Sequence, residues 1–299
     1  MSTIAFFGAI ESGLIYSLVA FAVYLSFRIL DFPDLTVDGS FPMGAAVCAV
    51  LIVSGINPWF ATVAAFFASC CAGMVTAWLN VKLGILNLLA SILTMIALYS
   101  INLRIMGKPN IALLGEKTIL SPTETWELPF YLSIPFVFTM ITLLIFIGLY
   151  WFLRSQKGLA MRATGANSKM AKAQGINTDR MIILGMALSN GMVGLAGSLF
   201  AQSQGSADVA MGVGVIVIGL ASLIGGEALL TPKNIFRALC ACVIGAIIYR
   251  LAIALALNSD FIGLQAQDLN LITAILVTFA IVAPKFKSKF ANKVKPNRD

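Results

Sequence analysis

Nine apolar stretches take up most of this chain and leave little room for a water-soluble core. Most of them approach the roughly 20 residues that an α-helix needs to cross the hydrocarbon of a membrane. Only 11% of the residues are charged, whereas a typical soluble domain carries about 25%. The pattern predicts an all-α, polytopic membrane bundle with about nine spans or partial spans, placed at residues 4–29, 41–54, 58–81, 86–106, 131–153, 180–203, 211–228, 236–257 and 269–284.

The composition also excludes several kinds of chemistry. The chain has no histidine, so it lacks imidazole metal ligands and any Ser-His or Cys-His nucleophile pair. Its five cysteines lie inside apolar stretches without a C-x-x-C motif, which favours small buried side chains over a metal site. We therefore expect no catalytic residue, no metal site and no enzyme activity in this chain.

Lysine and arginine gather in two stretches, and their positions predict the orientation in the membrane. Residues 154–180 and the tail after Pro284 hold 12 of the 20 basic residues. Basic loops stay in the cytoplasm, so both stretches are expected there, with the N-terminus outside and the C-terminus inside. Residues 1–284 then form one transmembrane domain, and 285–299 a basic cytoplasmic tail. The net charge of +7 follows from this topology, not from nucleic-acid binding. Residues 31–40, with three aspartates, are expected in a further cytoplasmic loop.

The basic segment 154–180 contains a candidate docking helix. Thr164 or Asn167 can cap a short helix over Ser168–Gln174, and Gly175 is a natural stop. A small apolar surface on this helix is offered by Met170, Ala171 and Ala173. The segment is either a loop lying on lipid headgroups or a helix that inserts into a groove on a cytoplasmic partner.

Two of the apolar stretches, 41–54 and 211–228, are short and rich in glycine. They run in opposite directions by the topology count, as expected for inverted repeats whose two broken helices meet near the membrane midplane. Close packing of small residues is the alternative reading. A ridge of glycines in the sixth stretch (Gly191, Gly194 and Gly197) predicts either packing within the chain or a dimer contact.

Polar residues inside apolar stretches need an explanation because they are costly there. Glu11 and Arg250 are the clearest charges at membrane depth, and they could pair or reach toward the surface. Candidate residues of a translocation path are Asn87, Thr94, Asn102 and Arg250, although for each neutral one a helix-to-helix hydrogen bond is favoured over a substrate contact. At the outer mouth, Gln202, Gln204 and Asp208 are candidates for contact with an external protein.

Longer motifs resemble a known family. Arg162-Ala-x-Gly-x-Asn-x-x-x-Ala-x-x-x-Gly-Ile-Asn, followed by the glycine-rich run from Ser189, is similar to the permease subunits of ATP-binding-cassette (ABC) importers, in the branched-chain amino-acid and ribose permease group. The chain looks closest to a tryptophan/tyrosine-type or substrate-unknown subgroup. The matching stretches are spread along almost the whole length, at residues 31–41, 93–107, 219–229 and 249–257.

The resemblance implies that residues 164–177 form a coupling helix seated on a separate ATPase. The residues that match this role are Arg162, Gly165, Asn167, Met170, Ala171, Gly175, Ile176 and Asn177. Further implied partners are a periplasmic or lipid-anchored substrate-binding protein, which Gln204 and Asp208 could contact, and a second permease copy in a homodimer. The chain has no G-x-x-x-x-G-K-[ST] motif, so ATP and Mg²⁺ are expected on the ATPase subunit.

The expected function is therefore the permease subunit of an importer in a bacterial inner membrane, for an aromatic amino acid or a related small solute. The alternative is a stand-alone secondary transporter. Such a transporter would need buried carboxylates for its coupling ion, and Glu11 and Glu227 are the few candidates. An intramembrane enzyme has no support, because no paired acid–base set is present.

Overall fold

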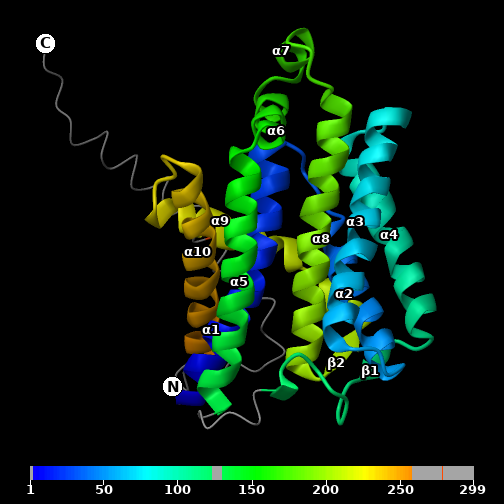
Figure 1. The fold of residues 1–299 in the computed structure, drawn as a ribbon, viewed down its shortest axis with the longest axis vertical. Coiled ribbons are helices and arrows are strands. Elements are labelled where there is room, and N and C mark those ends of the chain that lie inside the picture. The colour runs from blue at the N-terminus through cyan, green and yellow to red at the C-terminus, as the bar shows by residue number, and fades with distance from the viewer. Residues whose placement is uncertain (1–2, 123–129, 258–277, 279–299) are drawn as a thin grey trace, which may run out of the picture.

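The computed structural model describes residues 3–122, 130–257 and 278, and most of these residues are helical. Long helices stand side by side in one bundle (Figure 1). In chain order the elements are α1 (Thr3–Val23) with its π-helical continuation η1 (Tyr24–Ile29), α2 (Val37–Val53), α3 (Pro58–Leu83), α4 (Asn87–Met106), β1 (Asn110–Ala112), α5 (Phe130–Arg154), α6 (Gln156–Ala166), α7 (Ser168–Ala173), α8 (Thr178–Gln204), β2 (Ser206–Asp208), the 3₁₀ turn η3 (Val209–Gly212), α9 (Val215–Leu229) and α10 (Ile235–Leu257).

The prediction of an all-α membrane bundle is confirmed. Seven helices are long and apolar enough to cross a membrane, and α2 is a shorter apolar helix. Eight of the nine predicted stretches coincide with these helices to within a few residues. The ninth, 269–284, lies outside the described residues except for residue 278, and the tail 285–299 lies wholly outside them.

Local residues set the ends of the long helices. Helix α3 begins where the Asn57 side chain accepts a hydrogen bond from the Trp59 backbone N–H at 3.0 Å, with Pro58 at the first helical position. The same helix ends at Gly84, whose φ of +70° suits a residue without a Cβ atom. These signals lie within a few positions of each boundary, which is why the predicted and observed ends agree.

Helix α8 lies within the bundle and packs against α1, α2 and α3. A Cβ atom on Gly194 would lie 2.0 Å from Ser69 Oγ of α3, and one on Gly44 of α2 would lie 2.0 Å from the Gly194 carbonyl oxygen. Only glycine permits backbones to approach this closely. The glycine ridge of α8 therefore serves packing within the chain, which decides between the two predicted alternatives.

The two ends of the bundle are built differently. Helices α6 and α7 lie beyond one end, and the short sheet of β1 and β2 lies at the other (Figure 1). The strands are antiparallel, with Asn110 opposite Asp208. We refer below to these as the α6–α7 end and the β1–β2 end.

Candidate coupling segment and translocation path

The segment between α5 and α8 forms two helices. Ser155 caps α6 by accepting a hydrogen bond from the Gly158 backbone N–H, and Asn167 ends α6 in an extended conformation. The Asn167 side chain then caps α7 by accepting from the Met170 N–H at 3.0 Å. Sequence reasoning identified Asn167 and the short helix but treated the residues of α6 as a loop. Thr164, the other candidate cap, lies inside α6.

The turn after α7 directs the chain back into the bundle. Gly175 has a φ of +79°, and its N–H donates to the Lys172 carbonyl oxygen. The Asn177 side chain then caps α8 by accepting from the Arg180 N–H at 3.1 Å. Gly175 and Asn177 therefore define the turn that links α7 to α8. The stop at Gly175 was predicted from its residue type, whereas Asn177 was named only from the family motif.

The exposed surface of α7 differs from the predicted one. Met170 is 63% exposed, but Ala171 is only 3% exposed. Ala171 turns inward, and its carbonyl oxygen accepts the N–H of half-buried Ile176 across the turn. Met170 and the smaller Ala173 are therefore the apolar side chains that α7 presents, whereas Ala171 and Ile176 hold the segment together.

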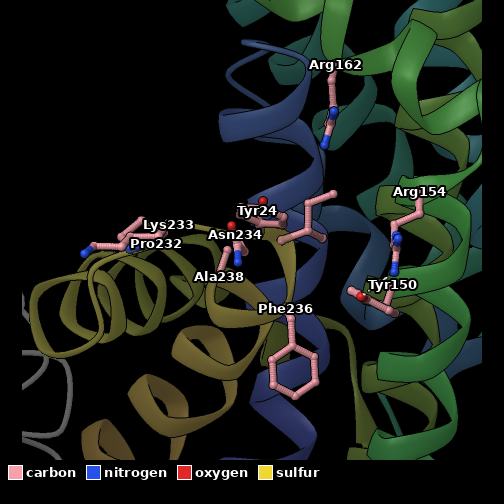
Figure 2. Close-up of a pocket in the computed structure, with 10 residues that line it drawn as sticks. Tyr24, Tyr150, Arg154, Arg162, Pro232, Lys233, Asn234, Phe236 and Ala238 are labelled. Atoms are coloured by element: carbon pink, nitrogen blue, oxygen red, sulfur yellow. Dashed lines mark hydrogen bonds between the residues drawn. The ribbon is translucent and has the colours of Figure 1, made fainter.

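Helix α6 connects this segment to the first membrane helix. A Cβ atom on Gly165 would lie 1.9 Å from the Ile29 carbonyl oxygen at the end of η1. This contact requires glycine, so α6 rests directly on the end of the first span. Arg162, one turn earlier, extends toward Tyr24 of η1 (Figure 2). Gly165 and Arg162 thus face the bundle, away from the exposed surface of α7.

The aspartate-rich stretch is not a cytoplasmic loop, contrary to expectation. Asp34 is completely buried, and its carboxylate accepts from the Thr36 N–H at 2.9 Å and from Asn190 Nδ2 at 2.7 Å. Asn190 lies near the middle of α8, so residues 30–36 descend from the end of η1 into the bundle. Asp31, by contrast, is exposed.

Hydrogen bonds around Asn190 hold the start of α2 between α3 and α8. Ser40 Oγ donates to Asn190 Oδ1 at 2.7 Å, and Ser69 Oγ of α3 donates to the Ser40 carbonyl oxygen at 3.3 Å. The hydroxyls of Thr36 and Thr76 are 2.8 Å apart. Buried polar groups need such partners, particularly where no water is available.

Asp38 joins the two short helices. It lies in the first turn of α2, and its carboxylate accepts from the backbone N–H groups of Gly214 at 3.1 Å and Ile216 at 2.8 Å. These N–H groups lie at the start of α9, and the first N–H groups of a helix have no acceptor inside the helix. The prediction that the two short stretches meet is confirmed, and the residue that joins them is an aspartate that sequence reasoning had placed in a loop.

A cavity of about 430 Å³ lies beside this α2–α9 junction. Its walls come from the start of α2, one face of α4 and the turn before α9. The lining is mainly apolar with a few polar groups: Asp38, Gly39, Pro42, Met95, Ile96, Tyr99, Ser100, Asn102, Val209, Ala210 and Val213. Such a lining is typical of a small-molecule site.

Of the four predicted path residues, one lines this cavity. Asn102 donates through Nδ2 to the Gly39 carbonyl oxygen at 3.1 Å, and its buried Oδ1 has no hydrogen-bond partner among the described residues. Thr94, earlier on α4, donates to the Ala90 carbonyl oxygen. Asn87 accepts from Asn80 at the far end of α4.

The remaining predicted path residue, Arg250, lies elsewhere. Its guanidinium stacks 3.9 Å above the ring of Tyr16, between α10 and α1. Glu11 accepts a hydrogen bond from Ser203 instead of pairing with Arg250. Arg250 thus has a packing environment of its own, apart from the cavity on α4.

At the β1–β2 end, the predicted docking residues differ in exposure. Gln204 is exposed, and Asp208 caps η3 by accepting from the Ala210 N–H at 2.7 Å. Gln202, in contrast, is buried, donates to Thr62 Oγ1 at 3.0 Å and accepts from the Ile119 N–H. Gln202 is therefore a structural hydrogen-bonding residue, not part of an outer surface.

The class of protein follows from these features together. Membrane-length helices pack around the shorter helix α2, which meets the start of α9 inside the bundle, and a cavity with a few polar groups lies beside the meeting point. This architecture defines an integral membrane permease, in which interrupted helices provide polar groups at membrane depth.

The chain belongs to the family described as branched-chain amino acid transport system / permease component, whose model matches residues 5–282. It is 42% identical to a tyrosine transport system permease protein of Clostridioides difficile over 88% of this chain and 86% of the relative. It is 35% identical to an uncharacterized protein of Rickettsia prowazekii over 93% of this chain and 96% of the relative.

A solved structure, described as PsaBC from Streptococcus pneumoniae in complex with Fab, shares the fold with a TM-score of 0.52. The sequences are 14% identical, and the match covers 92% of this chain and 89% of that one. Family membership makes the chain a multi-pass membrane protein, the translocation subunit of an ABC importer for small solutes such as amino acids. In a bacterium its place is the inner membrane.

Proposed function

We propose that this chain forms, with a second copy, the path of an importer for aromatic amino acids, driven by a separate ATPase. The ATPase, which carries ATP and Mg²⁺, binds the α6–α7 end on the cytoplasmic side. A substrate-binding protein delivers the solute at the β1–β2 end. The amino-acid class is supported by the relative named for tyrosine transport.

The observation that carries this proposal is the contact of α6 with the first span. Exposed Met170 on α7 is available to a groove of the ATPase, and the segment behind it is closed by local caps. Gly165 presses α6 against Ile29, directly before the segment that leads to Asp34 and Asp38. A movement of α7 is thereby transmitted to the α2–α9 junction, through contacts that differ between two conformational states of the permease.

The cavity on α4 is proposed as part of the path. Its apolar residues suit an aromatic ring, while Asp38 and the free Oδ1 of Asn102 are hydrogen-bond acceptors for an ammonium group. A stand-alone secondary transporter is disfavoured by the match to an ABC permease family. The carboxylates within the described bundle also have protein partners: Glu227 pairs with Arg28, Glu11 accepts from Ser203, and Asp34 accepts from Thr36 and Asn190.

Coupling is tested with Met170→Glu in proteoliposomes that contain the permease and its ATPase and are supplied with the substrate-binding protein. We expect uptake of labelled tyrosine to fall at least tenfold, because a carboxylate in an apolar contact is costly to desolvate. Gln174→Glu is the matched control, since Gln174 is also exposed beside α7. Equal uptake by both variants and the unaltered protein would refute the coupling assignment.

The path is tested by filling the cavity. Ser100→Trp places a large side chain on the cavity wall, whereas Ile101→Trp alters the next residue of α4, which does not line it. We expect Ser100→Trp to reduce uptake at least tenfold while the ATPase still copurifies, and Ile101→Trp to retain most uptake. Similar uptake by the two variants would remove this cavity from the path.

A further inference from the structure

A second cavity lies at the α6–α7 end, away from the proposed path. It has a volume of about 600 Å³ and is bordered by η1, the last turn of α5, α6 and the first turn of α10. Its lining contains three basic residues and no acidic one: Tyr24, Tyr150, Arg154, Arg162, Pro232, Lys233, Asn234, Ile235, Phe236 and Ala238.

Two arginines point into this cavity. Figure 2 shows Arg162 reaching toward Tyr24 and Arg154 reaching toward Tyr150, whereas the ammonium group of Lys233 points away. Arg154 donates to Tyr150 Oη at 2.9 Å, and neither arginine forms an ion pair within the described part of the chain. The carboxylate of Glu227, on nearby α9, is already paired with Arg28.

The backbone adds to this positive potential. Three residues of the lining, Ile235, Phe236 and Ala238, belong to the first turn of α10, a helix of 23 residues. The N–H groups at the start of a helix lack intrahelical partners and favour an anion. The site is therefore suited to a group with several negatively charged oxygens, such as a phosphate.

An apolar groove continues from this cavity along the bundle. It has a volume of about 410 Å³, lies mainly between α5 and α10, and shares Phe236 with the cationic cavity. Phe236 lies on the side of the cavity away from Arg162 (Figure 2). The groove has an almost wholly apolar lining: Leu14, Thr139, Thr142, Leu143, Phe146, Ile147, Phe236, Cys240, Val243 and Ile244.

We propose that the cationic cavity and the apolar groove together bind one anionic phospholipid. The phosphate lies between Arg154 and Arg162, and an acyl chain follows the groove past Phe236. Basic pockets between membrane helices on the cytoplasmic side bind such headgroups. Tyr150 and the exposed Trp151 add aromatic rings at this level, where membrane proteins place them beside the headgroups.

The chain contains a reporter for this site. Cys240 lines the groove and is partly exposed, and Cys71, on α3, is exposed but outside the groove. The full chain is purified with its copurifying subunits, delipidated and treated with a small maleimide, and alkylation of each cysteine is followed by mass spectrometry. We expect phosphatidylglycerol in mixed micelles to slow alkylation of Cys240 more than phosphatidylcholine does, with Cys71 equally reactive in both.

Charge-removing variants test the headgroup. Each basic residue near an anionic lipid surface contributes roughly fivefold in binding, so Arg154→Gln with Arg162→Gln is expected to require about thirtyfold more phosphatidylglycerol for the same protection. Arg237→Gln is the matched control, because Arg237 lies in the first turn of α10, which borders the cavity, but does not line it.

A second pair of variants tests the acyl chain. Ile244→Trp, which fills the groove, should lower the amount of copurified phospholipid. Ile248→Trp, one turn further along α10, does not line the groove and should not lower it.

Three outcomes overturn the proposal. Equal protection by phosphatidylcholine shows that no headgroup is recognised, and protection by inorganic phosphate alone assigns the cavity to a free anion. Slow alkylation of Cys240 without any lipid shows that protein covers the groove, either a second copy or the stretch 269–284. The comparison of the two lipids uses the unaltered protein, so it remains decisive if a variant does not fold. The comparison does not measure uptake, so the lipid-binding proposal can be refuted while the proposed transport function still holds.

Discussion

The α6–α7 segment and the α2–α9 junction are held together by different kinds of contact. In the α6–α7 segment, each cap lies within three residues of the N–H that it binds, as for Asn167 and Asn177. In the α2–α9 junction, Asp34 binds Asn190 and Asp38 binds Gly214, across 156 and 176 positions. The caps of the first region therefore need only neighbouring residues, whereas the hydrogen bonds of the second exist only when the bundle is assembled. Substitutions should accordingly lower stability far more in the junction than in the α6–α7 segment.

The largest effect is expected for Gly194→Val. A side chain at Gly194 meets Ser69 and the backbone of α3, so the helices must separate, at a cost of about 3 kcal/mol or more in folding free energy. We expect the monodisperse fraction in size-exclusion chromatography to be lost. Gly148→Val, on α5 with open space around it, should elute like the unaltered protein. A well-folded Gly194→Val variant would contradict the close packing of α8.

Asp34→Asn tests whether the buried carboxylate organises the junction. The new amide group must turn its nitrogen toward a donor, either the Thr36 N–H or Asn190 Nδ2, so one hydrogen bond is lost. A buried donor left without a partner costs about 1–3 kcal/mol, which should lower the thermal unfolding midpoint measurably. Asp31→Asn makes the same chemical change at an exposed position and should leave the midpoint unchanged. Equal midpoints would show that Asp34 does not hold the junction.

The two aspartate caps offer a smaller and more direct comparison. Asp38→Ala removes a cap that joins α2 to α9, and Asp208→Ala removes a local cap of η3. We expect Asp38→Ala to cost about 2 kcal/mol and Asp208→Ala about 0.5 kcal/mol, the two ends of the usual range for caps. Denaturant titration of both variants checks the order, and a larger effect at Asp208 would reverse our view of the junction.

The smallest effect is expected on the α6–α7 segment. Lys172 and Asp179 form an ion pair at 3.6 Å with both side chains largely exposed. Surface pairs of this kind contribute less than about 0.5 kcal/mol, so Lys172→Ala should leave the thermal midpoint within error at low and high salt. A drop of several degrees at low salt would show that this segment depends on the pair more than its exposure suggests.

The sequence predicted those parts of the candidate site that rest on neighbouring residues. Asn167 and Gly175 were identified because a cap or a positive φ depends on residue type and a few positions of chain, whereas Asn177 was named only from the family motif. Gly165 was named from the family motif, but its contact with Ile29 could not be inferred, since the two are far apart in sequence. The burial of Ala171 was missed because α7 is too short for an apolar face to be read from its periodicity.

The aspartates of residues 31–40 illustrate the opposite case. Acidic residues between two apolar stretches usually indicate a solvent-exposed loop, and that interpretation was wrong for Asp34 and Asp38. Nothing close to them in the chain shows that Asn190, Gly214 and Ile216 will supply donors. The same limit explains why Arg250 and Gln202 were given surface or path roles, although Arg250 stacks on Tyr16 and Gln202 is buried against Thr62.

The sequence by itself determined the all-α membrane fold, the positions of eight described apolar helices and the turns around α7. Each of these depends on hydrophobicity and capping, which act over one helix or one turn. Only the tertiary structure decided which buried groups pair, where the chain passes into the bundle and which cavities lie between the helices. Those features depend on helices that are distant in sequence and adjacent only after packing, because a buried polar group takes whatever donor the assembled bundle brings within reach.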